Sequence, residues 1–261
     1  YSFIGLPARK WLAASGFGAA ARTRFYADGA LVEEKNGNPL DVIADLQAQE
    51  KNYLPEGMPR FCGGLAGYFA YDVVRYIEKK LEHSCPPDTL GTPDIMLLQC
   101  DELAVIDNLK GRLQLIVWAD TRQPDAYATA CKRLQELQAQ LQQAAQLPPL
   151  QACSSAAVVT REFAKADFLQ AAQRGKDLIA AGDFMQVQIG QRLSQPFTQA
   201  PIHLYRALRQ LNPSPYMYFY DMGDFQIVGA SPEILVRQES VEYEGAAAEK
   251  ITIRPLAGTR P

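Results

Sequence analysis

Residues 216–220, Tyr216-Met217-Tyr218-Phe219-Tyr220, form an apolar, aromatic run of the kind found in β-strands. A turn separates this run from a second strand-like stretch, residues 225–228, and two more follow at 234–237 and 251–253. Tight turns between successive strands favour antiparallel pairing. The sequence therefore predicts an α+β fold built mainly from antiparallel sheets, with helices packed outside them.

Two helices are expected just before these strands, at residues 163–181 and 201–211, and a glycine directly after the first is a natural stop signal. Between the helices, residues 185–193 alternate apolar and polar, as in a strand that is buried on one face. Such a strand would place Val187 on one face and Gln186 on the other.

The first half of the chain carries local signals for a hairpin and a helix. Residues 22–32 are typical of a hairpin that turns at Asp28-Gly29, and Asn38-Pro39 is a good helix start because Asn caps and Pro suits the first turn. The small residues at 62–72 indicate a strand that another backbone approaches closely. Three further strands and one helix are expected at residues 95–99, 103–107, 113–118 and 125–145.

Residues 147–160 resemble a linker, which predicts two regions, 1–150 and 151–261. The chain has 261 residues, of which 48% are hydrophobic and 21% charged, so disorder is excluded for the chain as a whole. A net charge of -3 gives no basic excess that would attract nucleic acid or an anionic membrane, and no run of residues is apolar enough to span one.

The five scattered cysteines include no CxxC pair, which favours a reducing compartment and predicts a cytoplasmic protein. The two histidines, His83 and His203, lack metal-ligand spacing and are expected to be structural or exposed.

Several catalytic motifs are excluded. The string GASPE at residues 229–233 begins like a nucleophile elbow but lacks the final glycine, and Pro232 has no N–H to serve as an oxyanion donor. The glycines at 63–67 do not form GxGxxG, and no P-loop is present. Hydrolase, dinucleotide-binding and kinase functions therefore have no support in the sequence.

Four strings remain: GGLAGYFAYDVVRY at 63–76, NPSPYM at 212–217, GASPE at 229–233 and RPLAGTRP at 254–261. Together they resemble the chorismate-utilising enzymes, and NPSPYM is similar to the large-subunit branch of anthranilate synthase in particular. The resemblance covers nearly the whole chain. It implies a layered sandwich of antiparallel sheets with helices outside. It also implies that the chain is a fragment at both ends, with a Leu-Leu-Glu-Ser segment before Tyr1 and a C-terminal half after Pro261.

The resemblance implies catalytic roles for Glu233 and Gln186. The 4-hydroxyl of chorismate must leave as water, which requires a general acid, and the glutamate of the SPE string has that role in relatives. The alternative is that Glu233 pairs with Arg254 or Arg260. Relatives that add water carry Lys as a base where Gln186 stands; a neutral amide can orient ammonia but cannot deprotonate water. Without the resemblance, Gln186 would be interpreted as a solvated residue of a strand.

Two ligand sites are also implied. Gly258 and Thr259 match positions that hold the substrate's ring and carboxylate, and an exposed N–H with a hydroxyl suits an anion; a plain turn is the alternative. The resemblance also implies part of a tryptophan feedback site at Pro215, Tyr216 and Met217. The flat tyrosine ring and the soft methionine side chain offer apolar surface that suits an indole. An ordinary core strand competes with that interpretation.

The implied reaction is that of a lyase: chorismate and ammonia give anthranilate and pyruvate, the first step of tryptophan biosynthesis. The implied partners are a glutamine amidotransferase subunit that supplies the ammonia, and tryptophan as a feedback inhibitor. The implied cofactor is Mg²⁺, with ligands expected in the C-terminal half after Pro261 and none in this chain. Two alternatives stay open: aminodeoxychorismate synthase component I, and a piece that is inactive alone and acts only in structure or partner binding.

Overall fold

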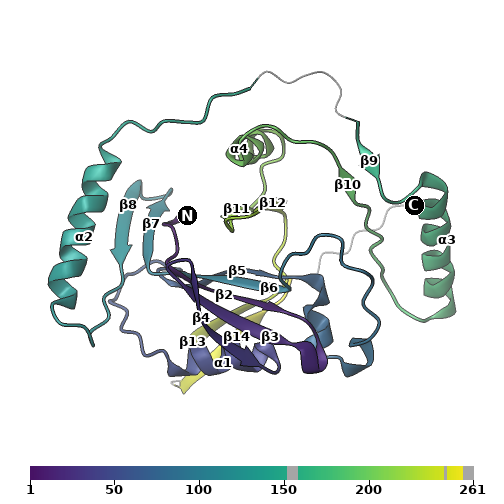
Figure 1. Cartoon of the computed structure of the whole chain (residues 1–261), viewed down its shortest axis with the longest axis horizontal. Helices are drawn as coiled ribbons and strands as arrows, with labels where there is room; N and C mark the ends of the chain where they lie inside the picture. Colours follow the sequence, from purple (N-terminus) through teal and green to yellow (C-terminus); the bar gives the residue numbers. More distant parts are fainter. Residues whose placement is uncertain (152–157, 244–245, 255–261) are drawn as a thin grey trace. The chain divides into compact units, whose positions relative to one another are not determined.

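The computed structural model describes residues 1–151, 158–243 and 246–254 (Figure 1). The chain divides into two compact units, Tyr1–Ala145 and Gln146–Pro261. Every strand pair among the described residues is antiparallel, which confirms the predicted α+β class. In the stretches that the structure covers, no helix has both the length and the apolar character needed to cross a membrane.

The first unit contains a five-stranded and a three-stranded sheet. The larger has the order β4-β3-β2-β6-β5 and the smaller the order β1-β7-β8. Its strands are β1 (Ser2–Gly5), β2 (Lys10–Ser15), β3 (Arg22–Ala27), β4 (Ala30–Asn36), β5 (Gly64–Phe69), β6 (Ile95–Cys100), β7 (Glu102–Asp107) and β8 (Arg112–Val117). Its helices are α1 (Pro39–Gln49), α2 (Ala126–Leu141) and the 3₁₀ turns η1 (Gly18–Ala20), η2 (Tyr71–Tyr76) and η3 (Lys79–Leu81).

The core of this unit lies between α1 and the five-stranded sheet. Its buried residues are Leu12, Ala14, Ile43, Ile95 and Leu97. A second buried cluster is formed by Cys62, Cys100, Leu103, Val105 and Ile116. The indole N–H of Trp118, which packs against the second cluster, donates to the Cys62 carbonyl oxygen at 2.6 Å. This bond ties the loop before β5 to the end of β8.

Three local predictions for this unit are confirmed. The β3–β4 hairpin turns at Asp28 and Gly29, whose φ angles of +48° and +84° suit a tight hairpin turn. Asn38 caps α1 by accepting a hydrogen bond from the Leu40 N–H at 3.0 Å. A Cβ at Gly67 would collide with the backbone of β6 at Met96, so this strand does need a small residue where another backbone approaches.

A partly buried carboxylate sits at the start of β6. Asp94 accepts hydrogen bonds from the Gly16 N–H at 3.2 Å and from the Tyr76 hydroxyl at 3.3 Å. Burial raises the pKa of Asp94 above its ordinary value, against the lowering effect of these two donors. Burial likewise raises the pKa of Tyr76. The pair joins η2 to the sheet through a hydrogen bond rather than an ion pair.

The described residues of the second unit form two helices and three two-stranded sheets. Its helices are α3 (Lys165–Ala181) and α4 (Pro201–Leu211). Its paired strands are β9 (Thr160–Arg161) with β10 (Leu193–Ser194), β11 (Tyr216–Asp221) with β12 (Gln226–Ser231), and β13 (Arg237–Tyr243) with β14 (Ala246–Thr252). Both predicted helices are confirmed, and Gly182 ends α3 with a φ of +87°.

Two strand predictions in this unit are wrong. Of residues 185–193 only Leu193 lies in a strand, because no other part of that stretch pairs with a strand in the described residues. The alternation is real but serves another contact: a Cβ at Gly175 of α3 would lie 3.1 Å from Val187 and 3.7 Å from Ile189. The strand expected at 234–237 instead begins at Arg237 and forms the polar hairpin β13–β14.

The described cysteines, Cys62, Cys85, Cys100 and Cys131, carry free thiols. The two histidines lie near polar groups: His203 Nε2 lies 2.8 Å from the Pro148 carbonyl oxygen, and His83 Nε2 lies 3.9 Å from a Glu82 carboxylate oxygen.

Candidate functional site

The β11–β12 hairpin brings two of the four strings together. Tyr216 and Met217, at the end of NPSPYM, pair with Ser231 and Ala230 of GASPE in antiparallel register. Figure 1 shows the two strands side by side, with α4 leading into β11. The start of one strand therefore meets the end of the other, and residues 13 and 15 positions apart in the sequence lie opposite each other.

Packing explains the glycine that begins GASPE. Gly229 pairs with Tyr218, and a Cβ at this position would overlap the phenol ring of Tyr218. Tyr218 in turn lies 5.8 Å from Tyr220, ring centroid to ring centroid. A glycine is required here because the aromatic ring of the opposite strand crosses directly over the backbone of β12.

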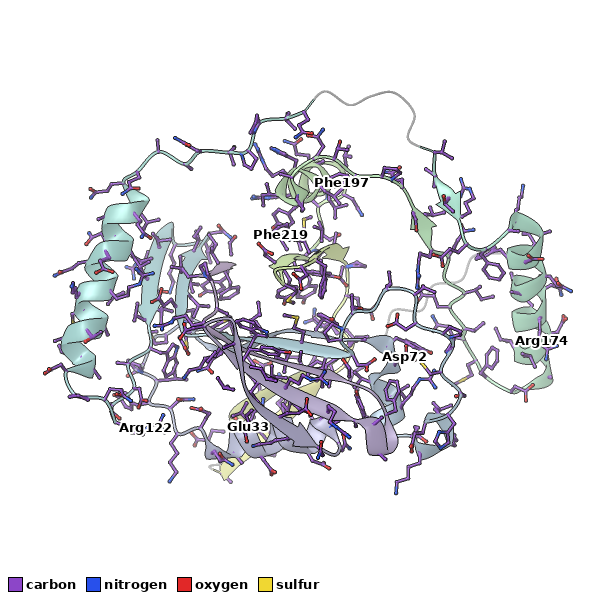
Figure 2. All side chains as sticks on the ribbon, viewed as in Figure 1. Glu33, Asp72, Arg122, Arg174, Phe197 and Phe219 are labelled. Atoms are coloured by element: carbon purple, nitrogen blue, oxygen red, sulfur yellow. The ribbon has the colours of Figure 1, made fainter. Side chains whose placement is uncertain are left out.

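Helix α4 supports the hairpin from one side. It begins at Pro201, a residue suited to the first helical turn, and its Tyr205 ring meets the Phe219 ring edge-to-face at 6.1 Å. Phe219 is labelled in Figure 2 on the hairpin next to this helix. The contact fixes the hairpin to α4, so the strand carrying Tyr216 and Met217 has a defined position relative to the helix.

Glu233 follows β12 and is held through its backbone. The hydroxyl of Ser231, the last residue of the strand, donates to the carbonyl oxygen of Glu233 at 2.9 Å. The N–H of Glu233 in turn approaches the hydroxyl oxygen of Ser231 at 3.5 Å. Pro232 stands between them, where the fixed φ of proline restricts the turn. The result is a two-residue turn at the end of β12, in which Glu233 is half-buried.

Gln186 lies in a different part of the second unit. Its segment follows α3 and is exposed at Gln186, while Val187 and Ile189 pack toward Gly175. Further along, the Gln191 amide donates to the Phe163 carbonyl oxygen at 2.8 Å. These contacts tie the segment to α3 and the residues before it, whereas Glu233 is tied to β12. Glu233 follows β12, whose Ser231 lies opposite Tyr216 of β11, whereas Gln186 belongs to the segment that follows α3.

The structure describes the residues predicted to bind tryptophan but not those predicted to bind the substrate's ring and carboxylate. Pro215 and Tyr216 are exposed and Met217 is half-buried, so the side chains of this set are partly open to solvent. Gly258 and Thr259 lie outside the described residues.

The described residues do not offer a magnesium site. Within residues 1–151, 158–243 and 246–254, no three His, Cys, Asp or Glu side chains gather closely enough to hold a metal ion. The donor set that Mg²⁺ prefers, carboxylates in octahedral geometry, is therefore not assembled by these stretches.

Sequence reasoning singled out GASPE and NPSPYM, and the antiparallel pairing that it expected for the strands at 216–220 and 225–228 is confirmed. It did not give the register that places Tyr216 opposite Ser231, or the hydrogen bond of the Ser231 hydroxyl. A signal for this hydrogen bond exists: a serine two residues before the residue of interest can bond its backbone in a local turn. The register depends on the geometry of the turn at residues 222–225, where the Met222 N–H donates to the Phe225 carbonyl oxygen at 3.0 Å.

The chain is similar to known proteins. Residues 3–261 match the family described as chorismate binding enzyme. The chain is 45% identical over 263 residues to anthranilate synthase component 1 of Neisseria meningitidis serogroup A, covering 100% of this chain and 51% of that protein. It is 44% identical over 269 residues to the protein of the same name from Pseudomonas aeruginosa, covering 100% and 52%.

A solved structure agrees. The crystal structure of anthranilate synthase component I from Streptococcus pneumoniae aligns with a TM-score of 0.72 at 29% identity, over 92% of this chain and 51% of that one. The chain thus spans about half the length of the curated relatives it matches. With the family match extending over residues 3–261, and with GASPE and NPSPYM joined in one hairpin, the chain belongs to the chorismate binding enzyme family.

Proposed function

We propose that this chain is the N-terminal and central portion of anthranilate synthase component I. The proposed reaction converts chorismate and ammonia into anthranilate, pyruvate and water. The observation that carries the proposal is the β11–β12 hairpin, which sets Glu233 at the end of the strand that pairs with NPSPYM. The names of the relatives and of the solved structure support the same reaction. Residues 1–150 would form the N-terminal region and 151–261 the first part of the catalytic region.

In this proposal Glu233 is the general acid. It donates a proton to the ring 4-hydroxyl, so that this group leaves as water while ammonia adds to the ring; loss of pyruvate then restores the aromatic system. The Ser231 hydroxyl holds the backbone carbonyl of Glu233 in the turn that follows β12. Gly258 and Thr259 would hold the substrate's ring and carboxylate.

The proposed role of Gln186 is to orient the ammonia molecule. A neutral amide can accept a hydrogen bond from NH₃ without acting as a base, which favours amine transfer over addition of water. The side chain is exposed in the second unit, so its assignment rests on the resemblance of its segment to amine-transferring relatives.

The implied partners and cofactor belong to the same proposal. A glutamine amidotransferase subunit would supply ammonia to component I in the cytoplasm. Chorismate binding enzymes generally use Mg²⁺, and no step above is assigned to it because the described residues assemble no ligand set. Pro215, Tyr216 and Met217 would form one wall of a tryptophan inhibitor site.

Product analysis tests the function directly. The protein that contains this chain, supplied with chorismate, ammonium and Mg²⁺, should release fluorescent anthranilate and an equal amount of pyruvate. An aminated product that keeps its pyruvyl group would instead identify aminodeoxychorismate synthase. The 261-residue chain alone should give no anthranilate above background; turnover by it would refute the proposal that further residues supply the metal ligands.

The inhibitor site has its own test. Calorimetry with the 261-residue chain should show weak or no tryptophan binding, because a Leu-Leu-Glu-Ser segment is expected to form the other wall. Micromolar affinity would contradict this assignment of the site.

A further inference from the structure

We propose that Ser231 is a positioning residue that sets the direction of Glu233; this inference rests on the proposed role of Glu233 as general acid. The hydroxyl of Ser231 is the only part of its side chain that can hydrogen-bond, and it is directed at the backbone of Glu233. Ser231 itself lies in β12, paired with Tyr216. It therefore connects a residue of the sheet to the residue that must place a proton.

The geometry makes the bond more than a generic turn contact. The Oγ···O distance of 2.9 Å is that of a well-formed hydrogen bond, and the second contact, at 3.5 Å, lies at its limit. Pro232 restricts one backbone dihedral in this turn, and the Ser231 hydroxyl constrains the carbonyl that follows. Together they leave the Glu233 backbone few orientations, which is the preorganisation that proton transfer requires.

The hydroxyl is not needed to hold the hairpin together. Strands β11 and β12 pair over six residues, from Tyr216↔Ser231 to Asp221↔Gln226, and Tyr205 packs on Phe219 independently of Ser231. Loss of the hydroxyl should therefore loosen Glu233 while β11 and β12 stay paired. This separates a positioning role from a structural one.

The test uses Ser231→Ala, Ser231→Thr and Ser231→Val in the protein that contains this chain, with ammonium as nitrogen donor. Loss of one hydrogen bond in the turn should lower kcat by about five- to tenfold in Ser231→Ala, with KM for chorismate nearly unchanged. Ser231→Thr retains a hydroxyl and should keep most of the wild-type rate. Ser231→Val, whose side chain has the shape of threonine but carries a methyl group in place of the hydroxyl, should not. If Ser231→Ala fails to fold, the Thr and Val pair decides, since these differ only in a hydroxyl against a methyl.

A solvent deuterium isotope effect on kcat supplies a readout that mere loss of folded protein would not move. Misplacing the acid should make proton transfer more rate-limiting and raise the isotope effect in Ser231→Ala. Ser84→Ala is the matched control, because it removes a serine hydroxyl that donates to the Leu81 carbonyl oxygen at 3.0 Å in the first unit. It should change neither kcat nor the isotope effect.

The outcomes separate the two proposals. If Glu233→Gln abolishes turnover but Ser231→Ala and Ser231→Val behave as the wild type, the positioning role is overturned and the general acid stands. If Glu233→Gln remains active, the proposed function of Glu233 fails first. Equal rates for the Thr and Val variants also overturn the positioning role.

Discussion

The phenol ring of Tyr218 occupies the space that a side chain at Gly229 would need. The two residues face each other across the β11–β12 pair, and the glycine is the first residue of the string that ends in Glu233. Close packing of an aromatic ring on the opposite backbone thus fixes the sequence of the hairpin before any chemistry is considered.

Gly229→Ala should destabilise the second unit. The added methyl group collides with the Tyr218 ring, and overpacking of this kind costs about 1–3 kcal/mol. Urea unfolding of the 261-residue chain measures the effect. Gly190→Ala is the matched control, because a Cβ there meets nothing within 4 Å and should leave the free energy of unfolding nearly unchanged. A Tyr218→Ala background should remove most of the cost; a full cost without the ring would contradict the packing explanation.

The buried carboxyl of Asp94 predicts a specific pH dependence. Because burial raises its folded-state pKa above the ordinary 3.8, the folded chain holds this proton more tightly than the unfolded chain. Its contribution to stability is therefore complete below pH 3.8 and declines as the pH rises from there through the raised pKa.

Asp94→Asn removes this titration. Urea unfolding at several pH values gives the unfolding free energies of the wild type and of Asp94→Asn. The wild-type value minus the variant value should fall as the pH rises above 3.8, the ordinary pKa of this carboxyl. A rising difference for Asp94→Asn would show that the two hydrogen bonds outweigh burial.

Gln186→Lys should damage amine transfer. An ammonium group placed where ammonia must be oriented can no longer accept its hydrogen bond, and the ammonium-dependent rate should fall by about tenfold or more. Chromatography of the products should also reveal a hydroxylated ring product, formed by the fraction of enzyme in which the lysine amine is neutral and can accept a proton from water. Gln188→Lys, also exposed on the same segment, should keep the wild-type rate. Wild-type anthranilate formation by Gln186→Lys would remove Gln186 from the site.

Local signals predicted much of the fold, because their causes lie within a few residues. The turn at Asp28-Gly29, the Asn38 cap and the end of α3 at Gly182 all depend on the backbone preferences of one or two residues, and each is confirmed. The strand predicted at 185–193 failed for the opposite reason: its alternation was visible, but a strand needs a partner, and here the apolar side packs on α3 instead.

The polar hairpin β13–β14 was predicted only at its open end, where the strands expected at 234–237 and 251–253 overlap it and Arg237 pairs with Thr252, because the rest of the hairpin carries no run of large apolar residues. Along β13, only alternate residues, Arg237, Glu239 and Val241, are half-buried, and two of these are charged and paired with each other at 2.9 Å. For the site, composition marked GASPE and NPSPYM as special. Their register depends on the geometry of the turn at residues 222–225, which the sequence does not specify, whereas the Ser231 bond to Glu233 is a local contact that the position of the serine could have indicated.

Substitution of Glu233 tests the central claim most directly. Glu233→Gln keeps the size of the side chain but removes its transferable proton, so kcat for anthranilate formation from chorismate and ammonium should fall by about 10²–10⁴-fold. The KM for chorismate should change little, and the melting temperature should stay near that of the wild type. A Glu233→Gln enzyme that forms anthranilate within about threefold of the wild-type rate would contradict the account, because such a small loss is far below what removing a general acid costs.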